Sequence, residues 1–389
     1  MKEAIEIYNF GPIREMKISD IKTFVVLIGR SATGKSTLMK IVALFRYIFK
    51  LANIRSYYHL SKIRRSPFRI DFAALLRENG LAGMVEQSTR VVYSATSESG
   101  AVYTVEYSEK KLQKLPDVAA EDLLFLKGAF VSENRNAISS WLGNGLERRG
   151  IKMGFYFDET LDLFLKATDS IKELALPYIG VNFSAHKTSN GVWQYSLHSE
   201  RRPEKKSIRL REASSGMKST VPLALIVNYM AHSFNFKDAY RRSIIDYLLK
   251  SDRLTDFKPV SELEGFQPVV AVHIEEPELS LDPASQVSLQ ECIVNTLFHS
   301  GIEDRRCMLM YATHSPYLAN HVNLLMAQYE HDPQSGLNPE DVEVYLTDED
   351  GGIRSVMVTD EQGRRIVDSE FLAKEIEDIY SLYSELRPS

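Results

Sequence analysis

The sequence predicts an α/β fold built on a mainly parallel sheet, and three short apolar runs support this prediction. Residues 24–29 (FVVLIG), 269–274 (VVAVHI) and 307–312 (CMLMYA) are continuous apolar runs, as expected of strands buried on both faces. Each run is followed by a segment with helical spacing of its apolar residues. Strands that alternate with helices in this way form parallel sheets.

The remaining segments add an antiparallel part and further helices. Residues 4–13 are typical of a strand that ends at a turn, and residues 90–95 and 101–107 alternate as the two arms of a hairpin do. Residues 332–389 hold 15 acidic and 5 basic side chains and predict a small hairpin around Asp350-Gly351-Gly352 and a final helix. Apolar spacing predicts the other helices over 35–48, 158–174, 216–233, 283–298 and from residue 316 onward.

Composition sets broad limits on the type of protein. The 389 residues leave room for one large or two modest domains, and 44% hydrophobic with 25% charged residues is typical of globular proteins. A net charge of −5 argues against general coating of nucleic acid. Cys292 and Cys307 match no zinc or redox spacing, which favours a cytoplasmic location. No signal peptide and no apolar run of about 20 residues is recognisable, so we expect no membrane contact.

A phosphate-binding loop follows the first buried run. The segment fits the pattern G-x-x-x-x-G-K-[ST], in which glycines let successive backbone N–H groups point at one anion. Lys35 would place its charge at the β- and γ-phosphates, and the Ser36 hydroxyl would bind Mg²⁺. We therefore predict an ATP site formed by Gly29, Arg30, Ser31, Ala32, Thr33, Gly34, Lys35, Ser36 and Thr37.

Two adjacent carboxylates follow the second buried run. Glu275 and Glu276 come directly after the apolar residues 269–274, at the end of a strand where parallel sheets bind ligands. Glu275 is predicted to reach Mg²⁺ together with Ser36. Glu276 is predicted to orient or deprotonate the attacking water.

Taken together, these motifs resemble the RecF/SMC/OLD branch of the ABC-type ATPases. Further motifs follow in the order of that branch, and the resemblance covers nearly the whole chain. They are the opening Asn9-Phe10-Gly11-Pro12-Ile13, the signature-like Ser214-Ser215-Gly216-Met217-Lys218, the D-loop-like Ser280-Leu281-Asp282 and the switch-histidine segment Ala312-Thr313-His314-Ser315-Pro316. The resemblance implies a P-loop NTPase head of the ABC type, with an antiparallel β lobe and a helical signature subdomain.

The chain departs from the family pattern at three places. Glu275 stands where the family usually has Asp, and Ser215 where it usually has Gly. The glutamine loop of the family has no clear match, and Glu133 or Asn134 is the best candidate. The resemblance divides the chain into an N-terminal ATPase lobe (1–133), a helical insert (134–213), a C-terminal ATPase lobe (214–331) and an acidic hairpin with a helix (332–389).

The resemblance also implies a homodimer. In the family, the signature of one subunit caps the nucleotide held by the phosphate loop of the other. Ser214, Ser215, Gly216 and Asp282 are therefore predicted to contact ATP in a partner copy, with Glu276, His314 and Lys35 as catalytic residues and Mg²⁺ as the metal. Donors at the start of a helix suit a γ-phosphate.

The biological role is the least determined part. The segment 134–213 lacks the heptads of an SMC coiled coil, and only 75 residues follow His314, which is too few for a nuclease domain of the OLD kind. The chain looks most like a compact, stand-alone OLD-like AAA ATPase of bacterial anti-phage defence, which would regulate a separate effector such as a nuclease or toxin.

The alternative is a RecF-like, ATP-dependent DNA clamp for DNA repair. Two basic clusters favour it, because basic and aromatic side chains suit phosphate backbones and exposed bases. Acids in the tail would then fold onto such a cluster or dock a basic partner. The first cluster is Arg55, Lys62, Arg64, Arg65 and Arg69, with Tyr57, Tyr58 and Phe68 between them; the second is Arg201, Arg202, Lys205, Lys206, Arg209 and Arg211.

Overall fold

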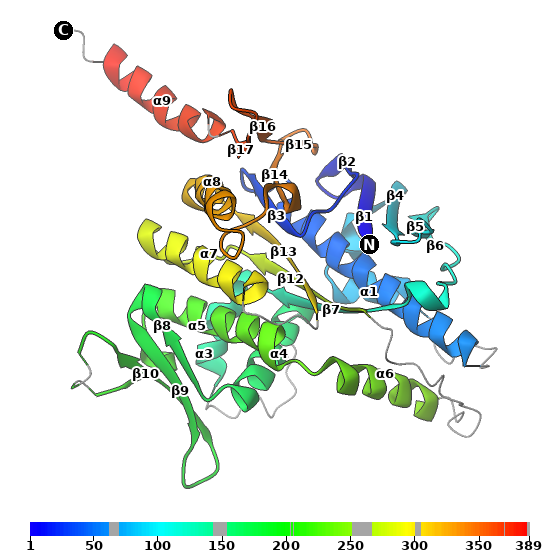
Figure 1. Cartoon of the computed structure of the whole chain (residues 1–389), viewed down its shortest axis with the longest axis horizontal. Helices are drawn as coiled ribbons and strands as arrows, with labels where there is room; N and C mark the ends of the chain where they lie inside the picture. Colours follow the sequence, from blue (N-terminus) through cyan, green and yellow to red (C-terminus); the bar gives the residue numbers. More distant parts are fainter. Residues whose placement is uncertain are drawn as a thin grey trace.

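The computed structural model shows a mixed α/β protein whose described residues form four sheets (Figure 1). In the described part of the chain, no helix combines the length and the apolar character needed to cross a membrane. The structure describes residues 1–61, 70–142, 154–202, 204, 206–250, 267–299, 305–368 and 370–386.

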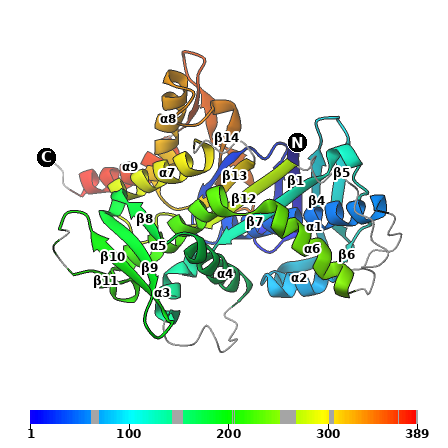
Figure 2. The same ribbon diagram turned by 60° about the horizontal axis from the view of Figure 1, so that its bottom comes forward.

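The central sheet has six strands in the order β15-β14-β3-β13-β12-β7, and all neighbours are parallel except β14 and β15. The three apolar runs are its adjacent strands β3, β13 and β12, so the predicted parallel sheet is confirmed. Helix α1 covers one face, and α7 and α8 lie on the other (Figures 1 and 2). The strands are β3 (Phe24–Gly29), β7 (Leu124–Val131), β12 (Gln267–Glu275), β13 (Arg306–Thr313), β14 (Val342–Thr347) and β15 (Ile353–Ser355).

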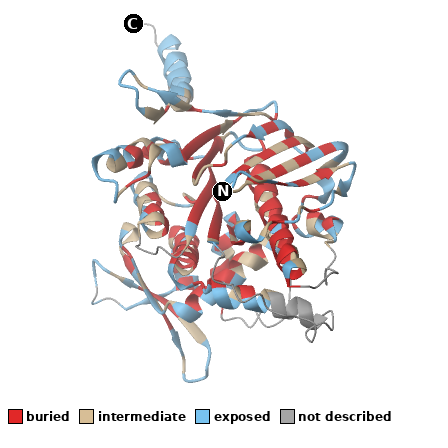
Figure 3. Ribbon diagram, turned by 45° about the vertical axis from the view of Figure 1, so that its right-hand side comes forward, coloured by how far each residue is buried: buried red, intermediate tan, exposed pale blue. Residues whose placement is uncertain are grey.

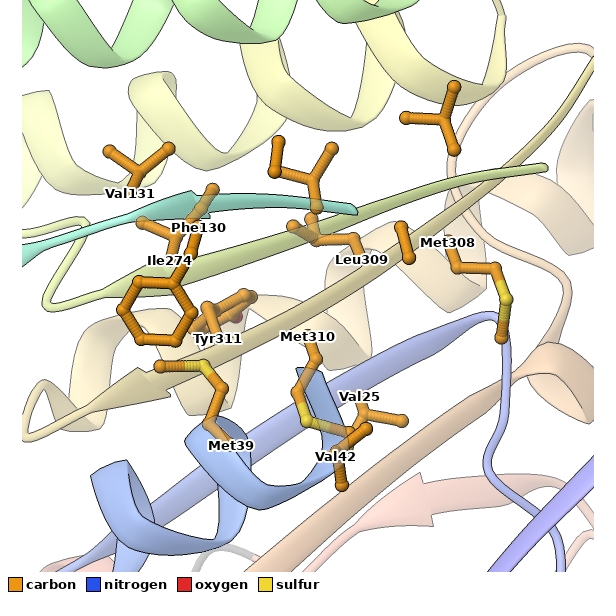
Figure 4. Packing of buried hydrophobic residues seen from close by; sticks show 14 of the residues in the cluster. Val25, Met39, Val42, Phe130, Val131, Ile274, Met308, Leu309, Met310 and Tyr311 are labelled. Carbon is orange, nitrogen blue, oxygen red and sulfur yellow. The ribbon is translucent and has the colours of Figure 1, made fainter. Parts of the chain in front are cut away.

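The core of the protein lies along both faces of this sheet. Nearly every residue of β3, β12 and β13 is buried, which explains why these strands read as unbroken apolar runs (Figure 3). Met39 and Val42 of α1 are fully buried and lie against the sheet in the same cluster as Met310 and Phe130 (Figure 4). Helix α1 therefore holds the loop that precedes it rigidly against the ends of the strands.

A second, antiparallel sheet of five strands in the order β2-β1-β4-β5-β6 packs beside α1. The predicted hairpin is present as β4 and β5, and the predicted opening strand is β1. Gly11 takes the left-handed conformation in the turn after β1 (φ 55°), where an added Cβ would lie 3.0 Å from Met84 Cβ. The strands are β1 (Lys2–Phe10), β2 (Ile13–Ile18), β4 (Val85–Thr96), β5 (Val102–Ser108) and β6 (Lys111–Leu112).

The segment before the signature differs from its prediction as a helical insert. Its described residues contain two α-helices, but its second half is an antiparallel sheet in the order β11-β10-β9-β8. Alternate residues of β9 are buried (Val181, Phe183, Ala185), so period-two burial overrides the helical expectation. For the same reason α4 ends at Ser170 rather than near 174. The strands are β8 (Glu173–Leu176), β9 (Val181–Lys187), β10 (Trp193–Ser199) and β11 (Ile208–Arg209).

The helices mostly match their predicted positions, although α1 continues a further three turns beyond residue 48. Its second half stays apolar because it is buried between the two sheets. Helix α5 ends at Asn228 and is followed by a single π-helical turn over Tyr229–Ser233. The helices are α1 (Lys35–Leu60), α2 (Phe72–Glu78), α3 (Ile138–Trp141), α4 (Phe155–Ser170), α5 (Ser215–Asn228), α6 (Phe236–Lys250), α7 (Pro283–Phe298), α8 (Pro316–His331) and α9 (Glu370–Glu385).

The acidic tail is tied to the central sheet by its first strand. β14 pairs in parallel with β3, and the predicted hairpin is present where β14 turns back into β15. Two short strands, β16 (Met357–Thr359) and β17 (Arg365–Val367), form the fourth sheet. The final helix α9 projects from the body and is largely exposed (Figures 1 and 3).

Candidate functional site

The phosphate loop joins β3 to α1 in the strained conformation that the motif requires. Gly29, Ala32 and Gly34 have positive φ angles of 149°, 65° and 96°. Gly29 has a second constraint, since an added Cβ would lie 2.5 Å from Thr347 Oγ1 of the neighbouring strand β14. The loop therefore curls tightly at the N-terminus of a 26-residue helix, which is a favourable place for an anion.

Lys35 lies inside this loop rather than in solvent. Its Nζ donates hydrogen bonds to the carbonyl oxygens of Gly29 (2.8 Å) and Arg30 (2.6 Å). Burial lowers the pKa of Lys35 to about 8, although the charges of Glu276 and Glu278 oppose this shift. Among the described residues, the ammonium bonds carbonyl oxygens and forms no ion pair, so it is available to a phosphate group.

The other loop residues divide into buried and exposed members. The Thr33 hydroxyl donates to the Arg30 carbonyl (2.8 Å) and lies 2.6 Å from Thr347 Oγ1, which ties the loop to β14. Thr37 is buried, with its hydroxyl 4.0 Å from Met84 Sδ. Ser31 and Ala32 are exposed at the tip, and Arg30 forms an exposed ion pair of 2.8 Å with Glu349.

Glu275 is the last residue of β12 and is buried. Its Oε1 lies 3.5 Å from Lys40 Nζ, and its Oε2 accepts from the backbone N–H of Glu133 (3.4 Å). Lys40 follows Ser36 by one helical turn, so both residues lie on the face of α1 that is turned toward the end of β12. The structure therefore brings the predicted metal ligands Ser36 and Glu275 to the same edge of the sheet.

Glu276 and His314 also come together at this edge. Glu276 has a positive φ of 44°, and its N–H donates to the Ala312 carbonyl at the end of β13 (2.9 Å). His314 Nε2 lies 3.8 Å from Glu276 Oε1. Burial and the nearby charge of Glu278 raise the pKa of Glu276, while His314 opposes the shift. A raised carboxylate pKa suits a group that accepts a proton from water.

Three residues at this edge are absent from the predicted site. Lys40 contacts Glu275, and Glu278 Oε1 accepts the His314 N–H (2.8 Å). Arg135 is fully buried and donates to the carbonyl oxygens of Glu275 (2.7 Å) and Glu276 (2.6 Å). The spacing of Lys40 from Ser36 could have indicated Lys40. The position of Glu278 in Glu-Glu-Pro-Glu could have indicated Glu278, whereas no local signal points to Arg135.

The predicted glutamine-loop candidates Glu133 and Asn134 lie beside this site, and the contacts there are made by their backbone N–H groups. The N–H of Glu133 bonds Glu275, and the N–H of Asn134 donates to Ser132 Oγ (3.2 Å). Both side chains are exposed. Their assignment to the glutamine loop stays a prediction.

The signature segment opens α5 and packs on the D-loop of the same chain. Ser214 is the N-cap of α5, and its side chain accepts from the Met217 N–H (3.4 Å). A Cβ at Gly216 would lie 2.6 Å from the Ser280 carbonyl oxygen, so this position requires glycine. Ser214 and Ser215 are exposed, and within the described residues no hydrogen bond joins them to the phosphate loop.

Asp282 has a local role as the N-cap of α7. Its carboxylate accepts from the N–H groups of Ala284 (3.1 Å) and Ser285 (3.2 Å). These bonds and the Ser285 hydroxyl lower the pKa of Asp282, the hydroxyl most strongly. Its predicted contact with a partner's nucleotide stays a prediction.

A hollow of about 530 Å³ lies beside the loop. Gly29, Arg30 and Thr33 line one side, His314 lies at its edge, and Phe371 and Lys374 of α9 line the other. The tail helix therefore begins next to the predicted ATP site. Among the described residues, no group of three or more His, Cys, Asp or Glu side chains is arranged to hold a metal.

The structure describes only part of each of the two basic clusters. Of the first, Lys62, Arg64, Arg65, Phe68 and Arg69 lie outside the described residues, and Arg55 lies 3.8 Å from Asp117. Lys205 of the second cluster also lies outside them. Arg209 and Arg211 line a hollow together with Trp193, on the sheet β8–β11.

No protein-family model and no curated protein matches the sequence. Three solved structures are similar at 11% identity. One is a dimeric, post-hydrolysis ATP-binding cassette bound to ADP and Pi, with a TM-score of 0.30 and coverage of 90% of this chain and 97% of that chain. The others are cbiO1 from Clostridium perfringens, part of the ABC transporter complex cbiONQ (TM-score 0.30; 98% of this chain and 95% of that chain), and the recombination mediator RecF with ATPrS in the RecFOR pathway (TM-score 0.33; 91% of this chain and 97% of that chain). At these values the likenesses carry no argument about activity.

Proposed function

We propose that this chain is an ABC-type ATPase that hydrolyses ATP with Mg²⁺ between two copies of itself. The observation that supports this most strongly is the meeting of Lys35, Glu276 and His314 at the carboxyl ends of β3, β12 and β13. Three separate segments of the chain each bring one predicted residue to that edge. Ligand sites of open α/β sheets lie at this edge.

The residues present fit a nucleotide and its metal. The loop supplies N–H groups at a helix N-terminus and an ammonium that only carbonyl oxygens hold. Ser36 and Glu275 offer oxygen ligands, which Mg²⁺ prefers. Mg²⁺, when bound, would neutralise charge on the transferred phosphate. Lys40, 3.5 Å from Glu275, places a positive charge at the same carboxylate.

Each residue then has a defined task. Lys35 binds the β- and γ-phosphates, and Glu276 accepts the proton of the attacking water. His314 lies beside Glu276 and orients it while contacting the γ-phosphate. Arg135 fixes the backbone of Glu275 and Glu276 without pairing with either carboxylate.

The signature is proposed to act across a dimer. Ser214 and Ser215 are exposed at the start of α5, where a partner's nucleotide can reach their donors. Gly216 holds that helix end against Ser280, next to Asp282. A two-fold symmetric pair would then contain two ATP molecules.

The decisive test of this activity is Glu276→Gln. Loss of the base is expected to reduce ATP turnover by about 10²–10⁴-fold while ATP affinity is retained. Turnover is measured by phosphate release and affinity by calorimetry. Glu330→Gln, the same change at an exposed position of α8, serves as the control. Full ATPase activity in Glu276→Gln would remove Glu276 from the mechanism.

For the biological role, we propose an OLD-like regulatory ATPase of the cytoplasm that acts on a separate effector, such as a nuclease or toxin of anti-phage defence. Neither Cys292 nor Cys307 forms a disulfide, as is usual in a reducing compartment. Purification of tagged Glu276→Gln from its native host with ATP and Mg²⁺ tests this. A stoichiometric nuclease or toxin in the eluate supports the role, and nucleic acid without such a protein contradicts it.

A second candidate, an ATP-dependent DNA clamp, rests on the sheet β8–β11. Lys172 and Lys187 lie over the Trp193 ring at 4.0 and 5.1 Å, next to Arg209 and Arg211. Basic groups around an aromatic ring suit single-stranded nucleic acid. DNA affinity that falls steeply with salt and is lost in Arg209→Glu/Arg211→Glu, but not in the exposed Lys114→Glu, would favour this candidate.

A further inference from the structure

A second cavity lies away from the predicted ATP site, between α1, α2, β7 and α4. Its volume is about 220 Å³, and Leu44, Leu75 and Phe155 contribute apolar walls. Four charged side chains also line it: Lys50 of α1, Glu78 of α2, Lys127 of β7 and Glu159 of α4. Figure 2 shows the four elements around this region.

Neither lysine forms an ion pair with another described residue, and the charge of Glu159 acts on both only from a distance. Among the described residues, no carboxylate lies within 4.0 Å of either ammonium; instead Lys50 lies over the Phe125 ring (4.8 Å) and Lys127 over the Phe234 ring (6.0 Å). Burial and then the charge of Lys127 lower the pKa of Lys50 to about 7. Burial also lowers the pKa of Lys127 and raises that of Glu159.

Such an arrangement is costly for an empty protein. Lys50 and Lys127 are half-buried. Charges that are partly removed from water are normally paired, and two like charges in one cavity repel each other. Glu159 is one carboxylate beside two lysines, and the second carboxylate of the lining, Glu78, is exposed to solvent. An anion inside the cavity would remove both costs, because it would neutralise Lys50 and Lys127 together.

We propose that this cavity binds a small organic anion, with a carboxylate or phosphate group at Lys50 and Lys127 and a flat apolar body against Leu44, Leu75 and Phe155. The apolar walls exclude a simple inorganic ion as the preferred ligand, since such an ion would leave them unfilled.

The cavity is connected to the predicted ATP site by one side chain. Tyr156 lines the cavity, and Lys40 Nζ lies 5.1 Å from the centre of its ring. The same Lys40 ammonium lies 3.5 Å from Glu275. Tyr156 and Lys40 thus lie between the cavity and the predicted metal ligand Glu275.

Calorimetric titration of the full chain with phenyl phosphate, benzoate and inorganic phosphate tests the binding itself. At least one aromatic probe is expected to bind about tenfold or more tightly than inorganic phosphate, and the better of the two identifies the acid group. Lys50→Met and Lys127→Met are each expected to weaken that probe about tenfold or more. Lys114→Met, at an exposed lysine, is the control and should bind as the unchanged protein does.

Thermal unfolding without probe gives a second, independent measurement. Removal of a half-buried cation that forms no ion pair among the described residues should raise the melting temperature in Lys50→Met and Lys127→Met, but not in Lys114→Met. The proposal is wrong if neither aromatic probe binds, if binding is the same in all three variants, or if both cavity variants melt lower than the control. None of these measurements depends on ATP hydrolysis, so failure of the ATPase proposal would be seen separately.

Discussion

Two fully buried arginines show how differently one kind of charge is held in two regions of the protein. Arg46 of α1 donates from Nε to both carboxylate oxygens of Glu3 (3.2 and 3.1 Å), and Tyr93 donates to the same carboxylate (2.5 Å). Arg135 donates only to carbonyl oxygens, those of Ser132, Ser219 and the two site glutamates.

The pKa values of the two arginines shift in opposite directions. Burial opposes the charge of Arg46, but the charge and hydrogen bonds of Glu3 outweigh it and raise the pKa of Arg46. Burial lowers the pKa of Arg135 to about 10, against the opposing charges of Glu278, Glu276 and Glu275. Arg46 is neutralised within the fold. Arg135 instead positions the strand end and leaves the carboxylates of Glu275 and Glu276 free for other partners.

The largest stability effect is expected at Arg46, because its loss leaves the buried carboxylate of Glu3 without its cation. Arg46→Met should lower the free energy of unfolding by about 3–5 kcal/mol. Denaturant unfolding measures this, with Arg14→Met, an exposed arginine of β2, as the control.

Removal of both charges sharpens this result. Glu3→Gln combined with Arg46→Met should recover part of the loss, because no buried charge then remains. If the double variant were less stable than Arg46→Met alone, the pair would not act as a neutral unit.

The second largest loss of stability is expected at Arg135, because its removal leaves no buried carboxylate without a cation. Arg135→Met should cost about 3 kcal/mol of stability, since it leaves buried carbonyl groups without donors. It should also lower ATP turnover about tenfold or more, because Glu275 and Glu276 lose the group that fixes their backbone. Arg135→Lys keeps the charge but has no fork of donors, so it should restore little activity. Full rescue by lysine would show that charge, not geometry, is what this position supplies.

A smaller effect is expected at Gly216, on the helix that Arg135 ties to the site through Ser219. Gly216→Ala places a Cβ against the Ser280 carbonyl oxygen and should cost about 1–3 kcal/mol. Gly83→Ala is the matched control, because its Cβ would meet nothing within 4 Å. Equal melting temperatures for the two variants would contradict the close packing of the signature helix on the D-loop segment.

The sequence was informative where a motif is local. Strand β3, the loop after it and the carboxylates after β12 are each defined by a run of a few residues, so burial and spacing suffice to predict them. His314 was predicted from its neighbours in the same way. These residues indeed meet at one edge, because parallel strands end together there.

The missed features depend on partners far along the chain. Arg135 reads as an ordinary residue after a strand until β12 and α5 supply its carbonyl partners, 84 to 141 positions away. Strand β14 carries the buried Glu343, whose charge suggests a surface hairpin rather than a sheet interior. Arg365 neutralises the Glu343 carboxylate and donates a hydrogen bond to it, and the Ser355 hydroxyl donates a second one (both 2.5 Å). These partners become visible only in the folded structure.

Lys35 extends the comparison to a third buried cation, and it gives the finest test. Like Arg135 it donates to carbonyl oxygens and forms no ion pair with another described residue, but burial lowers its pKa to about 8, so it titrates near neutral pH. Below pH 8 the ammonium is present before ATP binds. Above pH 8 the free protein has lost the proton, and ATP binding must take one up.

We therefore expect ATP affinity to be nearly constant from pH 7.5 to 8 and then to weaken by up to about tenfold per pH unit. Calorimetry in buffers of different ionisation enthalpy measures both the affinity and the proton uptake. Lys35→Met should bind ATP more weakly and without this pH dependence. An affinity of the unchanged protein that stays constant to pH 9.5 would mean that the carbonyl groups hold the Lys35 charge as firmly as Glu3 holds that of Arg46, and that such dipoles alone suffice to keep a buried cation protonated.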